Sequence, residues 1–296
     1  MTAPIALFVY NRLDHTRRTV DALRANEGAR ESDLFVFSDA PKNAQAAASV
    51  AQVRAFVKNI DGFKSVTVIE RESNWGVDPS IIDGVTTLCE RFGRVIVLED
   101  DLVTSPWFLT FMNESLSHYR DDDRVMQVGG FMFPLDDVDE AKASFLPYAT
   151  CWGWATWKRA WDQFDATAAG YASLKNDEIK RKAFDLNGAY FYFDILQNYI
   201  EGKTDAWDIR WYLSLFLKEG LALFPNKTLV RNIGFDGTGT HDSPTVFAGD
   251  GLNLTRVEKF PSIAIDAKIW KAIENYLKAQ RRTPLKNLVG KLLRWA

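Results

Sequence analysis

The sequence predicts an α/β fold with a mostly parallel sheet and helices on both of its faces. Through the first hundred residues, short apolar runs alternate with segments whose apolar residues recur at helical spacing. The short runs are apolar at consecutive positions, which is typical of strands that helices cover on both sides. Repeated β-α units of this kind pair into parallel sheets, and 296 residues are enough to bury a full core.

Four short apolar runs in this part of the chain are expected to be strands. They cover Ile5–Tyr10, Leu34–Phe37, Val66–Ile69 and Arg94–Leu98. The first connection is expected to be a helix, because Asp14 can cap a segment that carries Val20 and Leu23 on one face. The next two helices are expected over Ala44–Ile60 and Ile81–Phe92.

A second half, rich in aromatic side chains, follows a helix over Pro106–Tyr119 and a strand over Val125–Val128. The run Cys151–Trp157 opens it, and most of the ten Trp residues lie within it. Its further elements are expected to be helices over Ile179–Phe184, Tyr192–Glu201 and Ile209–Glu219 and a hairpin region over Leu221–Ile233. Aromatic rings pack cores and also form platforms for sugars, a role for which Trp152 and Trp154 are the candidates.

Bulk composition argues against several classes of protein. The net charge of -3 does not suit a general nucleic-acid binder, which needs a basic surface for phosphates. The two Cys residues, Cys89 and Cys151, make no disulfide framework. The opening residues lack the pattern of a signal peptide, and no apolar stretch approaches the roughly 18 residues that cross a bilayer. We therefore expect a cytoplasmic protein.

The last segment, residues 267–296, is basic and amphipathic. From Lys268 onward Lys and Arg residues are interleaved with apolar ones, and Glu274 is the one acidic residue. This composition is typical of a helix that lies on an anionic membrane surface, which would bring the protein to the inner face of the membrane. The alternative is a helix that packs on the protein and exposes a basic face to solvent.

Three neighbouring acids, Glu99, Asp100 and Asp101, come directly after the fourth expected strand. Like charges so close to a core repel one another, and a divalent cation with hard oxygen ligands resolves that conflict. Mg²⁺ or Mn²⁺ bridges carboxylates and phosphate oxygens, which suits a diphosphate leaving group. The alternative is a solvated acidic loop.

Other strands of the expected sheet also end in polar residues, namely Asn11-Arg12 and Asp39. Ligands of such sheets bind beyond the carboxyl ends of the strands. The phosphate-binding patterns Gly-x-x-x-x-Gly-Lys-Ser/Thr and Gly-x-Gly-x-x-Gly are both missing, so P-loop and nicotinamide enzymes are not indicated. A phosphatase with an Asp nucleophile is weakened but not eliminated, because Glu99 stands where that nucleophile belongs.

Five segments, in the same order along the chain, carry a resemblance to a known family. They are Tyr10-Asn11-Arg12, Ser38-Asp39, Glu99-Asp100-Asp101-Leu102 with Pro106-Trp107-Phe108, Gly153-Trp154 and Trp207-Asp208. Together they resemble the GT-A glycosyltransferases, and within them the inverting N-acetylglucosaminyltransferase I group with its bacterial relatives. The resemblance spans roughly residues 5–240. Asn11 replaces an acidic residue of the family, and Ala166–Lys203 matches no family segment.

The resemblance implies a metal-dependent, inverting glycosyltransferase that moves a sugar from a nucleotide-diphosphate donor, with a UDP-sugar favoured. The acceptor would be a hydroxyl of a glycan or a lipid-linked molecule, as in surface-polysaccharide biosynthesis, and Mn²⁺ or Mg²⁺ would be the cofactor. Residues 1–130 would form the half that binds the nucleotide-sugar. Residues 131–266 would form the acceptor-side half with the candidate base, and residues 267–296 the basic tail.

The resemblance also implies roles for the acidic triplet and its neighbours. Asp101 would bind the metal that holds the diphosphate, Asp100 would contact the ribose or the donor sugar, and Glu99 the sugar or the acceptor side. The base and phosphates would be bound by Arg12 and Asp39, with Asn11 beside them at the end of the first strand.

Asp208 would be the general base that takes the proton of the acceptor hydroxyl. Trp207 and Trp211 flank it, and apolar neighbours raise the pKa of a carboxylate. The alternative is a helix cap, because Asp208 begins an amphipathic segment, and Asp205 is the nearest competitor for the base.

Two weaker candidates complete the predicted site. His241 follows a Gly-rich loop and would bind the metal or the diphosphate, although lone histidines are more often structural. Trp75 follows the third strand and would border the donor. Two other functions stay open: a phosphatase or nucleotidyltransferase that uses the acidic cluster, and a non-catalytic sugar-binding module built on the Trp-rich half.

Overall fold

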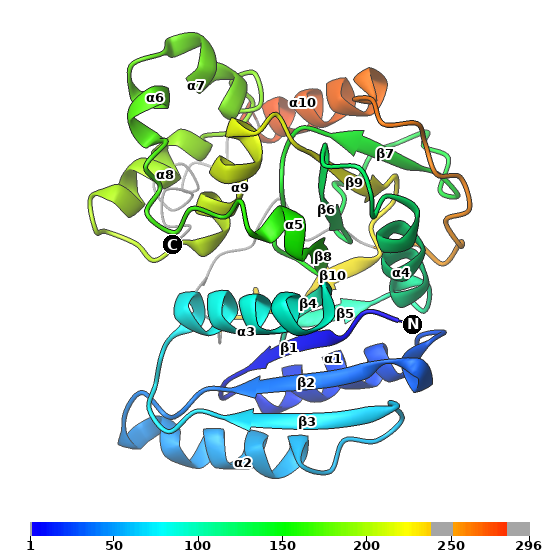
Figure 1. Ribbon diagram of the computed structural model, residues 1–296, viewed down its shortest axis with the longest axis vertical. Coiled ribbons are helices and arrows are strands. Elements are labelled where there is room, and N and C mark those ends of the chain that lie inside the picture. The colour runs from blue at the N-terminus through cyan, green and yellow to red at the C-terminus, as the bar shows by residue number, and fades with distance from the viewer. Residues whose placement is uncertain (1, 238–250, 283–296) are drawn as a thin grey trace.

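The main layer of the protein is one mixed sheet (Figure 1). The computed structural model describes residues 2–237 and 251–282. The strands of the sheet are β1 (Ile5–Val9), β2 (Asp33–Ser38), β3 (Ser65–Glu70), β4 (Arg94–Glu99), β6 (Val125–Gly129), β7 (Ala143–Leu146), β8 (Trp154–Trp157) and β9 (Leu221–Pro225). Within the described residues their order is β3-β2-β1-β4-β8-β6-β9-β7. A second, two-stranded sheet pairs β5 (Leu102–Thr104) with β10 (Val230–Asn232).

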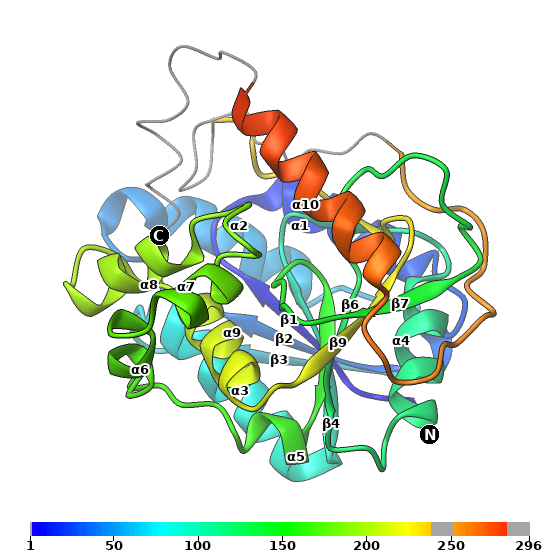
Figure 2. The same ribbon diagram turned by 90° about the horizontal axis from the view of Figure 1, so that it is seen from above.

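Helices cover both faces of the sheet. They are α1 (Leu13–Arg24), α2 (Ala47–Val57), α3 (Val77–Phe92), α4 (Phe108–His118), α5 (Lys158–Trp161), α6 (Tyr171–Lys175), α7 (Glu178–Phe184), α8 (Tyr192–Ile200), α9 (Trp207–Leu217) and α10 (Ala267–Arg282), with short 3-10 turns at Ala29–Glu31 and Ala44–Ala46. Figure 2 shows α1 and α2 on one side of β1–β3 and α3 on the other. None of the helices in residues 2–237 and 251–282 is both long and apolar enough to span a bilayer.

Most strands of the main sheet run in one direction. β1 pairs in parallel with β2 and β4, and β2 pairs in parallel with β3. β8 lies antiparallel between β4 and β6, β9 is parallel to β6, and β7 closes the far edge antiparallel to β9. The predicted α/β class with a mostly parallel, helix-flanked sheet is therefore confirmed. The sheet also continues across residue 130, so the two predicted halves share it.

Two predictions about the second half are corrected. Trp154–Trp157, expected only as part of an aromatic-rich region, is a central strand that joins β4 to β6. The hairpin expected over Leu221–Ile233 does not form, because its two strands have different partners. Leu221–Pro225 pairs with β6 and β7, whereas Val230–Asn232 pairs with β5.

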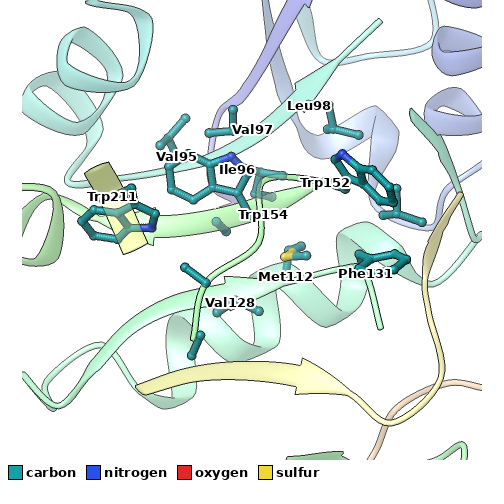
Figure 3. Packing of buried hydrophobic residues seen from close by; sticks show 14 of the residues in the cluster. Val95, Ile96, Val97, Leu98, Met112, Val128, Phe131, Trp152, Trp154 and Trp211 are labelled. Atoms are coloured by element: carbon teal, nitrogen blue, oxygen red, sulfur yellow. The ribbon is translucent and has the colours of Figure 1, made fainter. Parts of the chain in front are cut away.

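The core on the α9 side of the sheet is built around Trp154. Figure 3 shows its indole beside Val95–Leu98 of β4, with Trp211 of α9 next to it. Trp154 has no exposed surface, and its ring centroid lies 5.4 Å from that of Trp207 and 6.1 Å from that of Trp211. A ring without exposed surface cannot receive a ligand, so Trp154 is a core residue and not a sugar platform.

The basic helix α10 packs on the body of the protein. Its apolar residues Ile269, Ile273 and Leu277 are buried. Glu274, which is also buried, forms an ion pair with Lys271 at 3.1 Å. The apolar face is thus covered by protein and is not available to a lipid surface. The packing alternative is confirmed for Ala267–Arg282, and the expected membrane contact of this part is corrected; residues 283–296 lie outside the described part of the chain.

Candidate functional site

The parallel strands β1, β2, β3 and β4 end at one edge of the sheet, called here the carboxyl edge. Strand pairing sets Ser38 opposite both Val9 and Glu70. It also sets Phe8 opposite Glu99. The residues that follow the four strands therefore meet along one line, as the sequence predicted.

The centre of this edge is an arginine held between two acids. The Arg12 guanidinium donates to Asp100 Oδ1 at 2.6 Å and to Asp101 Oδ2 at 2.8 Å. The backbone N–H of Tyr10 also donates to Asp100, at 3.3 Å. Asp101 and Asp100 were predicted to gather near Arg12, and the structure brings all three together. Arg12, however, contacts the acids directly, which the sequence analysis did not foresee.

Burial and pairing set the charge of this cluster. Burial raises the pKa of Asp100, with Arg12 acting against it and Asp101 adding to it. Burial also lowers the pKa of the Arg12 guanidinium, but the two acids outweigh that effect and raise it above its usual value. Arg12 thus stays charged and neutralises part of the repulsion that the adjacent carboxylates would otherwise feel.

The strand β10 returns the chain to the acidic cluster. The N–H of Ile233 donates to the carbonyl of Asp101 at 2.8 Å, and Gly234 follows. A Cβ on Gly234 would lie 2.2 Å from Asp101 Oδ2 and 3.0 Å from the Arg12 guanidinium. His15 Nε2 of α1 lies 3.2 Å from the carbonyl oxygen of Ile233, so α1 also contacts this segment. The chain can pass so close to the cluster only because residue 234 has no side chain.

Replacing Gly234 by Ala is expected to push Asp101 away from Arg12. Overpacking of this kind costs about 1–3 kcal/mol of unfolding free energy, and here it also disturbs the proposed ligand site. The control is Gly220→Ala, directly before β9 at the opposite edge of the sheet, where a Cβ would lie 2.3 Å from Met126 Sδ. Both variants should melt earlier, but only Gly234→Ala should weaken UDP or GDP binding in calorimetry. Equal binding by both would contradict this reading of Gly234.

Asp39 organises the loop that follows β3. Its carboxylate accepts from the backbone N–H of Ala40 and Trp75 at 2.9 Å and of Gly76 at 2.8 Å, and from Asn74 Nδ2 at 2.9 Å. A carboxylate has about four acceptor positions, and these bonds fill them. Asp39 therefore holds the loop of Trp75 in place. Its predicted direct contact with the nucleotide base stays a prediction.

Trp75 is an exposed aromatic residue of this loop. It is 41% exposed, and the Arg71 guanidinium lies 3.8 Å from the centroid of its ring. Arg71 itself pairs with Asp83 of α3. Asn11, the remaining residue predicted for this side, is half-buried between β1 and α1.

A metal ion is implied by the predicted chemistry, and the residues at the carboxyl edge fit it in part. Within the described ranges no three His, Cys, Asp or Glu side chains converge as a site made of protein ligands alone requires. Asp101 is partly exposed and offers carboxylate oxygens, which suits Mg²⁺ or Mn²⁺ held by one or two carboxylates plus substrate phosphates. His241, the other predicted metal ligand, lies outside the described residues.

Asp208 lies in a pocket whose empty space, open solvent at its mouth included, amounts to about 690 Å³. Its lining is mostly aromatic: Phe131, Phe133, Ala149, Thr150, Cys151, Trp152, Tyr190, Tyr192, Ile195, Trp207, Asp208, Ile209, Trp211 and Tyr212. Asp208 is the acidic side chain among these described residues. Trp152, one of the two predicted sugar platforms, lines the pocket, and the Thr150 hydroxyl is buried with no hydrogen-bond partner. We call this cavity the Asp208 pocket.

Asp208 stands in the first turn of α9 but does not cap the helix. The cap position is Ala206, which makes no side-chain bond to the helix. Asp208 Oδ1 accepts from the N–H of Ile209 at 2.9 Å, and the Cys151 thiol donates to Oδ2 at 3.7 Å. The competitor Asp205 is exposed and does not line the pocket.

The Asp208 pocket is electrostatically coupled to the carboxyl edge through Glu99. Burial raises the pKa of Glu99 well above its usual value, and Asp101, Asp100 and Asp208 all add to that. Burial likewise raises the pKa of Cys151, followed by the charges of Asp208 and Glu99. The charges of Asp208 and Glu99 therefore both act on the Cys151 thiol.

Cys151 can report the charge of Asp208. Removing that charge with Asp208→Asn should lower the pKa of Cys151 and raise its thiolate fraction, although burial remains the larger cause of the shift. One pKa unit changes that fraction tenfold, so we expect alkylation by iodoacetamide at pH 8 to accelerate on the order of 3- to 10-fold. Peptide mass spectrometry measures this, with Cys89, whose pKa burial raises to about 12, as internal control. An unchanged rate would place Asp208 too far away to act on the thiol.

One ion pair beside the site, between Asp78 of α3 and Arg210 of α9, was not predicted from the sequence. The two side chains are 12% and 7% exposed. A signal was present, because Arg210 lies between the apolar positions Ile209 and Trp211 of a helix that buries most of its residues. A charged residue in such a run requires a buried partner.

Comparisons with known proteins give a similarity of fold only. No protein-family model matches the chain, and no curated protein matches it in sequence. The mannosyltransferase PcManGT from Pyrobaculum calidifontis, solved in complex with GDP-Man and Mn²⁺, is similar over 53% of this chain and 45% of its own, with 15% sequence identity and a TM-score of 0.37. S. aureus TarS is similar over 79% of this chain and 37% of its own, with 12% identity and a TM-score of 0.43. This chain spans less than half the length of either protein.

Proposed function

We propose that this chain is an inverting glycosyltransferase of the GT-A type that uses a nucleotide-diphosphate sugar. The main support is that the chain builds two separate charged groups: Asp100 and Asp101 gather around Arg12 at the carboxyl edge, and Asp208 stands in an aromatic pocket. A transfer between two substrates needs such a pair, one group for the leaving diphosphate and one for the acceptor hydroxyl.

The donor would lie along the carboxyl edge, from the end of β3 to the end of β4. These strands are three places apart in the sheet, and three spacings of about 4.8 Å amount to roughly 14 Å. That length suits an elongated nucleoside diphosphate. The exposed ring of Trp75 at one end would stack on the base, and Arg12 near the other end would lie by the phosphates.

The leaving diphosphate needs positive charge, and two sources are proposed. Arg12 uses a single nitrogen, Nη2, for both acids, and its remaining N–H donors would point toward phosphate oxygens. Asp101 would hold a divalent cation together with the phosphates, and that cation would neutralise charge on the leaving group. Arg12 pairs with Asp101 Oδ2, so the other carboxylate oxygen, Oδ1, would be the one offered to the cation.

The acceptor would enter the Asp208 pocket. Trp152 would support the apolar face of an acceptor sugar, and Asp208 would take the proton from the attacking hydroxyl. Direct displacement by that hydroxyl inverts the anomeric centre. A glycan or a lipid-linked molecule met in the cytoplasm is the proposed acceptor class.

Incubating the protein with UDP-glucose, UDP-N-acetylglucosamine and GDP-mannose, with and without Mn²⁺, tests this function. We expect slow release of nucleoside diphosphate from one of these donors, with water as the acceptor, and a thermal shift with the matching nucleotide plus Mn²⁺. Release of free phosphate instead would indicate the phosphatase alternative. Binding of sugars without any nucleotide binding would indicate a sugar-binding module.

A further inference from the structure

An ion pair connects the donor side of the molecule to the helix that carries Asp208. The Arg210 guanidinium on α9 donates to Asp78 Oδ2 on α3 at 2.5 Å. Arg210 is 6% exposed, so the pair is shielded from water on the arginine side. Burial raises the pKa of Asp78 to about 6, with Arg210 acting against it and Asp208 adding to it. Asp78 therefore lies within electrostatic reach of the proposed base as well as of Arg210.

Arg210 also fixes the start of its own helix. Its Nε donates to the carbonyl of Ala206, the cap residue of α9, at 3.1 Å, and its Nη1 donates to the carbonyl of Ala166 at 3.1 Å. The ring of Tyr199 lies 4.5 Å from the guanidinium carbon. A planar guanidinium is suited to such a task because its five donors have fixed directions. One side chain thus ties α3, the Ala166 loop and the first turn of α9 together.

Asp78 stands close to the proposed donor loop in the chain. Asp39 at the end of β2 holds the N–H groups of Trp75 and Gly76, and Asp78 follows two residues later in the first turn of α3. The loop held by Asp39 thus leads directly into the turn of Asp78, and Asp78 is joined through Arg210 to the first turn of α9.

Stability alone gives little reason for this pair. Taking two charges out of water is costly, and well-packed apolar side chains of similar size often stabilise a core as well or better. The surroundings are apolar, as Trp207 and Trp211 are both buried on the same helix. A hydrogen-bonded ion pair, unlike an apolar contact, fixes the orientation of the two helices that carry it.

We propose that Asp78 and Arg210 are positioning residues that hold the first turn of α9, and with it Asp208, in register with the carboxyl edge. This inference rests on the proposed function. The reacting atoms of donor, acceptor and base must approach within about 3–3.5 Å in the correct direction, and a displacement of 1 Å costs on the order of 100-fold in rate. The two residues touch neither substrate, and they act on the reaction only through the placement of Asp208.

The test compares Arg210→Lys and Asp78→Asn with the wild-type chain in release of nucleoside diphosphate from the donor that the wild type uses. Lysine keeps the charge but cannot reach Asp78 and two carbonyls at once, and asparagine keeps the shape of Asp78 while removing its charge. We expect kcat to fall about 10- to 100-fold in each variant, with the KM for the donor within about twofold of the wild-type value.

The matched control is Arg159→Lys. Arg159 also donates to three backbone carbonyls, those of Tyr119, Arg120 and Val125, but it lies at the opposite edge of the sheet, where β6 begins. It should lose thermal stability and keep kcat. Hydrogen exchange of the amides in residues 207–211 gives a second measurement, and faster exchange is expected in the Asp78 and Arg210 variants only.

The outcomes separate the two proposals. If the wild-type chain cleaves none of the nucleotide sugars, both the proposed function and this inference are wrong. Wild-type turnover with unchanged kcat in both variants overturns the positioning role alone. A parallel fall of kcat in Arg159→Lys, or a rise in donor KM that accounts for the loss, would also overturn it, because general destabilisation or donor binding would then explain the effect.

Discussion

Asp208→Asn is expected to lower the rate of sugar transfer by about 10²- to 10⁴-fold while nucleotide binding is retained. Asparagine has the shape of aspartate and can still accept the bond from the N–H of Ile209, so the turn should persist. It cannot accept a proton, and among the described residues that line the pocket no other side chain is acidic. The measurement is kcat for nucleoside diphosphate release, together with calorimetry of UDP or GDP.

The control for this variant is Asp205→Asn, three residues earlier and exposed to solvent. It should leave kcat unchanged. If Asp205→Asn lost turnover and Asp208→Asn kept it, the base would have to be reassigned. If Asp208→Asn lost nucleotide affinity together with turnover, Asp208 would belong to donor binding and not to proton transfer.

Arg12→Ala is expected to destabilise the fold by about 3–5 kcal/mol, because it leaves two neighbouring carboxylates without their partner. Asp100 is 5% exposed and cannot recover the loss by hydration. If the same carboxylates accept a divalent cation, Mn²⁺ should raise the melting temperature of Arg12→Ala more than that of the wild type. Thermal unfolding with and without Mn²⁺ measures both effects.

Arg24→Ala is the matched control for Arg12→Ala. Arg24 ends the helix that Arg12 precedes, and it also pairs with two acids, Asp21 and Asp61, but all three side chains are exposed. Its loss should cost about 1 kcal/mol or less, and Mn²⁺ should not restore it. A variant Arg12→Ala that melts like the wild type, or that ignores Mn²⁺, would contradict the picture of a cation-binding acidic cluster.

The parallel part of the sheet could be predicted from sequence because its strands are apolar on both faces. Leu34–Phe37 and Arg94–Leu98 each differ from the observed strand by one residue at an end, or at both. The position of Trp154–Trp157 could not be predicted. It is four residues long and is inserted between β4 and β6, and neither partner is its neighbour in sequence. Pairing across such separations leaves no local pattern.

Half of the site followed from the same reasoning. Acids placed after buried strands had to meet at the carboxyl edge, and Asp100 and Asp101 do. That the Arg12 side chain neutralises them could not be predicted, because Arg12 lies almost ninety residues away in the sequence and only the tertiary fold brings it there. Trp152 lines the pocket and Trp154 is buried in the core, although the two residues are only two positions apart. Composition cannot show which of two such close Trp residues reaches a pocket.

The place of β8 in the sheet has a consequence for how the molecule can be divided. Because β8 joins β4 to β6, a fragment that ends at residue 130 would leave the backbone groups along one side of β4 unsatisfied. Such an open border invites association with other chains. Fusion partners, inserted tags and split-protein designs should therefore avoid residue 130, even though the sequence changes character there.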